Sequence, residues 1–271
     1  MFFDSHAHYD DERFDLDRDD LLKKINQSVD YVINCGADLK SSRESINLAN
    51  RFDFIFAAVG VHPENVKDIK QKDLDELEFL AKKNKKVKAI GEIGLDFYQK
   101  DFSRDEQIYF FKKQLEIANK LNLPVIIHSR EANQDTFEII KSCARTSGVI
   151  HCYSGDIKMA LDYINLGFFI GIGGIITFKN AKKMLDVVKN ISIENILLET
   201  DCPYLSPEPN RGKRNDSSNL IYVAQKIAEI KNISLNEVAE KTKLNAKKLF
   251  DMNQIAKKKY PNAFLIMFGF F

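Results

Sequence analysis

VKAIGEI, residues 87–93, decides the fold, because it is a short run rich in apolar and β-branched residues that carries the carboxylate Glu92 at its far end. A run of this length and composition predicts a strand buried in a parallel sheet. Similar runs recur along the chain at 1–4, 31–34, 54–61, 124–128, 148–152, 168–172 and 196–200. Eight such strands, alternating with longer segments of helical period, predict an α/β fold of the (β/α)8 TIM-barrel type.

Between the strands, apolar residues repeat at threes and fours, as Ile108, Phe111 and Leu115 do in DEQIYFFKKQLEIANKLN. This spacing predicts amphipathic helices. The other predicted helices cover 13–28, 73–84, 132–145, 157–166, 179–190, 218–232, 234–242 and 244–252. A doubly wound open sheet is the competing architecture, but no glycine-rich phosphate loop follows the first strand.

Composition bounds the class of protein. A chain of 271 residues, 44% hydrophobic and 29% charged, predicts one globular domain over 1–271 and excludes a membrane-buried body. The net charge of +1 provides no global field for nucleic acid or an anionic membrane, so an anionic ligand needs a local site. The first residues do not read as a secretory signal, and the sequence leaves the oligomeric state open, with a monomer favoured. We therefore expect a cytoplasmic monomer.

Two further features concern cysteines and the C-terminal end. The four cysteines contain no C-x-x-C pair, so we expect reduced thiols rather than a disulfide framework. The apolar tail AFLIMFGFF, residues 263–271, is about half the length of a membrane span. It docks on the domain or on a partner subunit, or it is a poorly ordered end.

Polar residues gather where the predicted strands end. All five histidines fall at such ends, although core packing does not require it. The predicted rim residues are His6, His8, His62, Glu92, His128, His151 and Asp201. The carboxyl ends of barrel strands share one rim, so these side chains are predicted to form one site.

The donor types indicate a metal site. His6 and His8 are two apart on a strand and so point to one side, where both imidazoles can reach one ion. With His128, His151, Glu92 and Asp201 they exceed what one ion takes, which favours two divalent ions (Mg, Mn or Zn) bridged by Glu92.

For several of these residues, a structural role is the alternative to metal ligation. The two N-terminal histidines can be a hydrogen-bonded core pair, and Glu92 can be one partner of a buried salt bridge. Asp96 is either a support behind the ligands or a group facing the substrate. Glu199 is a buried ion-pair partner or, less favoured, a ligand.

A basic segment follows the last strand. EPNRGKRNDSSN, residues 208–219, contains Arg211, Lys213 and Arg214 in a glycine-containing loop at the same rim. These cations are either solvated surface charges or anchors for phosphate groups, and Arg130 beside His128 is a candidate for the same role.

Seven motifs occur in an order that resembles the TatD family of metal-dependent deoxyribonucleases, within the amidohydrolase-like barrels. They are DSHAHYD, VGVHPE, GEIGLDFY, HSREA, HCYSG, LETDCPYLSP and RGKRND, and the resemblance covers about 4–250. It implies metal ligation by the six donors named above and a place for His62 near the substrate phosphate. Two positions differ from the family pattern: Ala7 replaces a common cysteine, and NDSSN follows the basic cluster.

The resemblance implies hydrolysis of phosphodiester bonds, with DNA or RNA ends as the partner. We expect a 3′–5′ exonuclease on single-stranded DNA, or on RNA, with Glu92 and Asp201 as catalytic residues. Phosphates would be positioned by His62, Arg130, Arg211 and Lys213. The rivals are an amidohydrolase or esterase such as an aminoacyl-tRNA deacylase, and a non-catalytic metal-binding or nucleic-acid-binding module. Glu92 occupies the strand-four place where many amidohydrolase-like barrels carry a modified lysine, which favours the nuclease.

Overall fold

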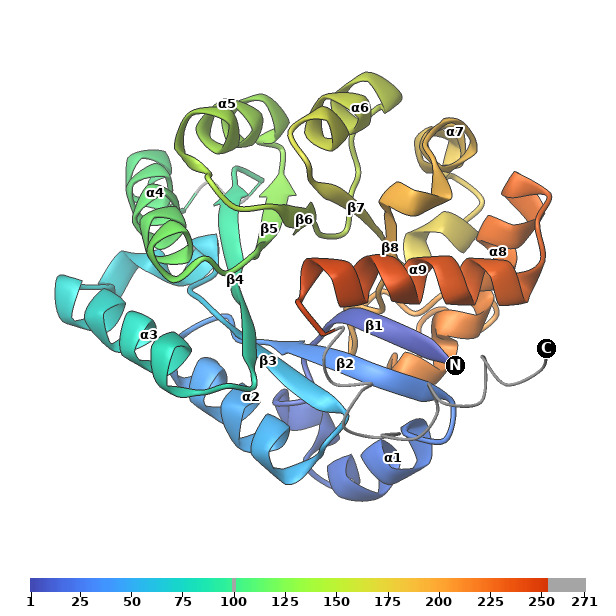
Figure 1. Ribbon diagram of the computed structural model, residues 1–271, viewed down its shortest axis with the longest axis horizontal. Coiled ribbons are helices and arrows are strands. Elements are labelled where there is room, and N and C mark those ends of the chain that lie inside the picture. Colours follow the sequence, from blue (N-terminus) through green and yellow to red (C-terminus); the bar gives the residue numbers. More distant parts are fainter. Residues whose placement is uncertain (99–100, 253–271) are drawn as a thin grey trace, which may run out of the picture.

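Eight parallel strands form one sheet in chain order in the computed structural model, which describes residues 1–98 and 101–252 (Figure 1). The strands are β1 (Phe2–Ala7), β2 (Val29–Cys35), β3 (Ile55–Val59), β4 (Val87–Asp96), β5 (Val125–Arg130), β6 (Gly148–Ile150), β7 (Phe169–Ile172) and β8 (Ile196–Leu198). Helices surround the sheet in Figure 1, as expected when both faces of a parallel sheet are buried. The predicted (β/α)8 barrel is confirmed.

The helices lie close to their predicted positions, with two differences. They are α1 (Arg18–Ile25), α2 (Leu39–Arg51), α3 (Gln71–Lys83), α4 (Arg104–Leu121), α5 (Asn133–Cys143), α6 (Ile157–Asn165), α7 (Lys182–Asn190), α8 (Leu220–Lys231) and α9 (Leu235–Leu249). The sequence did not predict α2. The last two predicted helices form the single helix α9, because no proline or glycine interrupts the chain between them.

The seam between the first and last strands closes through residues of the rim. The Asp201 N–H donates to the His6 carbonyl at 2.9 Å, and the His8 N–H donates to the Cys202 carbonyl at 2.8 Å. Below them the buried carboxylate of Asp4 accepts hydrogen bonds of 2.6 Å from the hydroxyls of Thr200 and Ser217. These bonds hold His6, His8 and Asp201 side by side.

The barrel interior is packed with side chains and closed at the amino ends of its strands. Strand residues such as Ile33, Phe56 and Ile126 form one buried cluster with the end of α9. The Phe250 ring, which follows α9, stacks on Phe3 with centroids 5.8 Å apart. The interior is therefore a core rather than a pore, and only the opposite rim is available for a site.

Two predictions concern membranes and the chain end. Within residues 1–98 and 101–252, no helix is both long and apolar enough to cross a bilayer. The apolar tail at 263–271 lies outside the described residues.

The contact between Phe250 and Phe3 gives a stability prediction. Phe250 is 1% exposed, so Phe250→Ala leaves a cavity in the core. We expect a loss of about 3–5 kcal/mol in the free energy of unfolding, measured by urea denaturation. Leu244→Ala, on the exposed side of α9, is the matched control and should change stability by less than about 0.5 kcal/mol. If both variants lost the same free energy of unfolding, the Phe250 contact would not close the barrel as described.

Candidate metal centre

The structure gathers all six predicted metal ligands at the carboxyl ends of the strands. His6 and Glu92 lie within β1 and β4, and His128 lies within β5. His8 and His151 directly follow β1 and β6, and Asp201 lies three residues after the end of β8. The parallel topology brings these ends to one rim, although the residues are scattered from position 6 to position 201.

One half of the cluster is built around the two histidines of the first motif. The Nε2 atoms of His6 and His8 are 2.9 Å apart. They lie 3.3 and 3.6 Å from Glu92 Oε2, and 3.6 and 3.5 Å from Asp201 Oδ1. Two imidazoles and two carboxylates thus point toward one small space.

The other half faces the second oxygen of the same glutamate. His128 Nδ1 is 2.9 Å from Glu92 Oε1, and His151 Nε2 is 3.6 Å from it. His151 Nε2 also lies 3.7 Å from Asp201 Oδ1. Because the two oxygens of Glu92 face different pairs of imidazoles, the geometry is the one that a bridging carboxylate requires.

The outward nitrogens of the first pair are supported by one residue of β2. His8 Nδ1 is 2.9 Å from the Cys35 carbonyl, which fixes the hydrogen on Nδ1 and leaves Nε2 with a lone pair toward the cluster. His6 Nδ1 contacts Cys35 Sγ at 3.5 Å. Cys35 was not predicted, because nothing in the sequence around it marks a role beyond the core.

Carboxylates support the second pair. His128 Nε2 is 3.0 Å from Asp96 Oδ2, and His151 Nδ1 is 3.1 Å from Glu199 Oε1, the latter an ion pair poorly aligned for a hydrogen bond. Glu199 Oε1 also accepts the Cys152 N–H at 2.6 Å. A carboxylate behind the imidazole is the usual arrangement that orients a histidine ligand. Glu199 lies two residues before Asp201, and this spacing was the feature of the sequence that could have predicted its position behind His151.

The charges of the cluster fit a cation. Burial alone would raise the pKa of Glu92, but the His6 and His151 imidazoles hold that pKa well below its ordinary value. Burial opposes protonation of His151, yet Glu199 and Glu92 outweigh it and raise the His151 pKa to about 10. The carboxylates therefore attract a proton to His151, at a position where a divalent cation would supply the same charge, whereas burial and the neighbouring His151 lower the pKa of His6. The donor set of nitrogen and carboxylate oxygen suits Zn, Mn, Fe or Co.

His62 lies against this cluster, and its imidazole is neutral. Its Nδ1 accepts the Glu64 N–H at 3.2 Å, so the hydrogen of a neutral ring is on Nε2, which lies 3.7 Å from Glu92 Oε1. Burial lowers the His62 pKa to about 3. A neutral ring with its N–H toward the site is suited to donate to an anionic oxygen.

Two cavities open beside the cluster. The polar cavity, of about 410 Å³, is bordered by Asp10, Asp11, His62, Glu64 and Asn65. The apolar cavity, of about 390 Å³, is bordered by Cys152, Ile175, Leu205, Ser154 and Arg130. Both share His128, His151, Asp201 and Tyr204, so the cluster lies where the cavities meet.

The predicted cations are distributed unequally. Arg130 lines the apolar cavity, whereas Arg211 and Lys213 line neither of the two cavities. The Arg211 guanidinium lies over Phe178, 4.3 Å from its centroid. Arg214 forms a bidentate ion pair with Asp17, at 2.6 and 2.8 Å. This pair joins two distant segments of the chain and so contributes to the fold.

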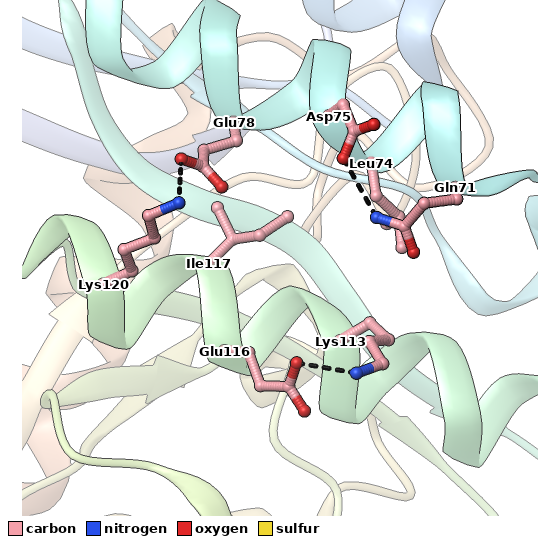
Figure 2. Close-up of a pocket in the computed structure, with 8 residues that line it drawn as sticks. All are labelled: Gln71, Leu74, Asp75, Glu78, Lys113, Glu116, Ile117 and Lys120. Carbon is pink, nitrogen blue, oxygen red and sulfur yellow. Dashed lines mark hydrogen bonds and ion pairs between the residues drawn. The ribbon is translucent and has the colours of Figure 1, made fainter.

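A further groove lies between α3 and α4, on the outer surface of the barrel. Figure 2 shows two ion pairs among its charged side chains, and these join Lys120 to Glu78 at 2.6 Å and Lys113 to Glu116 at 2.8 Å. Asp75, which also lines the groove, accepts a hydrogen bond from the neutral amide of Gln71 at 3.0 Å, so the groove carries one carboxylate beyond its two ion pairs.

Comparison with known proteins identifies a family. The model of the family described as TatD related DNase matches residues 3–251. The chain is 39% identical over 256 residues to a protein of Bacillus subtilis named "Uncharacterized metal-dependent hydrolase YabD", covering 93% of this chain and 100% of the relative. It is 34% identical to the Escherichia coli protein "Uncharacterized metal-dependent hydrolase YcfH", over 92% of this chain and 96% of the relative.

Solved structures agree with this similarity. The TatD homologue YJJV from Escherichia coli superposes with a TM-score of 0.87 at 30% identity, covering 92% of this chain and 98% of the other. A TatD family hydrolase from Entamoeba histolytica gives a TM-score of 0.83 at 28% identity, with 92% and 98% covered. The resemblance drawn from the seven motifs is confirmed.

The contact between Glu199 and His151 gives a prediction about metal affinity. Glu199→Gln keeps the size of the side chain and an oxygen for the Cys152 N–H, but removes the charge behind His151. We expect the affinity of metal-free protein for Mn²⁺ or Co²⁺ to fall about 10- to 100-fold, measured by calorimetric titration. Glu194→Gln, an exposed partner of Lys241, should leave the affinity unchanged. An unchanged affinity in Glu199→Gln would assign Glu199 to the core alone.

Proposed function

This chain belongs to the TatD-related DNase family of metal-dependent hydrolases, and on that premise we propose that it hydrolyses phosphodiester bonds at the 3′ ends of single-stranded DNA. The observation that carries the proposal is Glu92, whose two oxygens face separate imidazole pairs. A phosphoryl group being displaced has an attacking and a leaving oxygen, and both need charge stabilisation. A site with two cation positions around one carboxylate supplies it on both sides.

The ligand roles proposed for this cluster follow its two halves. His6, His8, Glu92 and Asp201 would hold one divalent ion, and Glu92, His128 and His151 would hold the other. Such ions, when bound, lower the pKa of water and withdraw negative charge from the phosphoryl oxygens. Mg, Mn and Zn are the candidate ions.

Asp201 is the proposed base. Burial would raise its pKa, but His151 and His8 outweigh burial and lower it, so the carboxylate is ionised at neutral pH. It would orient the attacking water and accept its proton while the water oxygen bonds to phosphorus and the bond to the sugar oxygen breaks. The departing sugar oxygen takes a proton from solvent.

The remaining polar groups would position the substrate. His62, a neutral donor at Nε2, would hydrogen-bond a non-bridging phosphoryl oxygen. Arg130 lies at the mouth of the apolar cavity, where its guanidinium would contact a neighbouring phosphate. Arg211 and Lys213, outside both cavities, would contact phosphates farther along the strand.

The test of this function couples metal content to cleavage. We expect chelated protein to be inactive, and Mg, Mn or Zn to restore release of nucleotides from a 3′-labelled single-stranded oligonucleotide. Glu92→Gln should lose at least about 100- to 1,000-fold in rate after reloading. Glu78→Gln, in the outer groove, is the matched control and should keep the wild-type rate. Retained activity in Glu92→Gln, or cleavage of an aminoacyl ester but of no oligonucleotide, would overturn the proposal.

The positions of Arg211 and Lys213 give a prediction about strand length. The double variant Arg211→Ala/Lys213→Ala should bind a 12-nucleotide strand more weakly and with a salt dependence shallower by about one unit for each lost phosphate contact. Binding of a dinucleotide should not change. Lys120→Ala, at an exposed cation on α4, is the control for charge alone. An equal loss on the dinucleotide would place these side chains inside the site.

A further inference from the structure

The apolar cavity is the feature of the rim that metal binding leaves unexplained. Its volume of about 390 Å³ lies within the roughly 300–1,000 Å³ of small-molecule sites. It shares His128, His151 and Asp201 with the metal cluster, so its contents lie directly beside the reacting group. Ile175 and Leu205 form an apolar wall that a phosphate or a metal ion does not need.

The backbone holds this wall in a strained conformation. Leu205 has a φ of 53°, in the left-handed region that is unfavourable for a leucine. Close packing explains how it is held: a Cβ at Gly174 would lie only 2.1 Å from the Leu205 carbonyl oxygen. Cys152 and Asp201, with φ values of 44° and 56°, line the same cavity. Strain gathered at one cavity is a mark of function rather than of stability.

Flat groups border the opening of the cavity. The Arg130 guanidinium lies over Tyr98, 3.8 Å from its centroid, and its Nη1 is 4.0 Å from Asp96 Oδ2. The Tyr204 ring lines the cavity with an Arg13 guanidinium 4.1 Å from its centroid. Guanidinium planes and aromatic rings are the surfaces on which nucleobases stack.

The two cavities differ in charge, and this difference indicates in which direction a DNA strand would lie across the cluster. Beyond the cluster, the polar cavity carries the carboxylates of Asp10 and Glu64, whereas the apolar cavity carries Arg130. The Asp11 carboxylate also lines the polar cavity, but Arg13 pairs with it at 2.8 Å. A second phosphate would be repelled in the polar cavity and attracted at the mouth of the apolar one. The terminal nucleotide of a DNA strand ends in a 3′ hydroxyl, which can donate a hydrogen bond to a carboxylate oxygen.

We propose that the apolar cavity is a nucleobase site for the penultimate nucleotide, on the strand side of the scissile phosphate, and that Arg130 contacts that nucleotide's own 5′ phosphate. The terminal nucleotide then lies toward the polar cavity. This inference rests on the proposed nuclease function and adds the direction in which the strand lies across the metal cluster.

The test compares single-stranded oligonucleotides that lack one base. Removing the penultimate base should lower kcat/KM for release of the terminal nucleotide by about tenfold or more, whereas removing the terminal base should lower it less. Anisotropy of a labelled strand on metal-free protein should give the same order of affinities. Equal losses at the two positions, or the reverse order, would overturn the inference while leaving the nuclease function in place. Absence of cleavage of every oligonucleotide would instead refute the proposed function.

Variants of the wall separate stacking from folding. Ile175→Ala and Leu205→Gly should reduce the ratio of kcat/KM between the intact and the penultimate-abasic strand toward one. Glycine at 205 also suits the local backbone, so this variant tests the side chain without adding strain. Ile230→Ala, a partly buried isoleucine on α8 outside the cavity, is the matched control and should retain the wild-type ratio. A wild-type ratio in both wall variants would overturn the inference.

Discussion

The rim of the barrel depends on the charge of one carboxylate, Glu92, which is only 4% exposed among imidazoles. An ionised carboxylate removed from water is strongly unfavourable unless positive charge and hydrogen-bond donors surround it. His151, whose pKa is raised to about 10, supplies positive charge 3.6 Å from Glu92 Oε1, and its ring stacks on that of His6 with centroids 3.6 Å apart. The need to compensate Glu92 explains why histidines from distant parts of the chain lie so close together.

The cluster around Glu92 is also connected to the barrel by backbone hydrogen bonds. The Cys152 N–H donates to Glu199, and the Asp201 N–H donates to the His6 carbonyl, so both left-handed residues are held by hydrogen bonds next to the cluster. Beneath them, burial raises the pKa of Asp4 to about 7, although hydroxyl and amide donors lower it. The barrel seam and the metal cluster therefore share their hydrogen bonds, and local backbone strain is offset by the packing around it.

The chemistry of the rim is asymmetric around this centre. Carboxylates dominate one cavity, while apolar side chains and a guanidinium dominate the other. The barrel core contributes the layer beneath, where Cys35 and its neighbours exclude water from below the ligands. A reacting group held at the junction would face water and a polar wall on one side and a dry wall on the other, which strengthens electrostatic contacts there.

The sequence by itself determined the eight strands and predicted that the histidines gather with Glu92 and Asp201 at one rim, because strand burial and βα alternation leave a local pattern. It missed α2, divided α9 in two, and gave Arg214 no structural role, although Arg214 pairs with Asp17 across 197 positions. Only the tertiary structure decided which oxygen of Glu92 faces which imidazole, that Glu199 and Cys35 contact the outward nitrogens of the histidines, and that one cavity is acidic and the other apolar. These features arise from side chains distant in sequence and close in space, and hydrophobic period carries no information about such contacts.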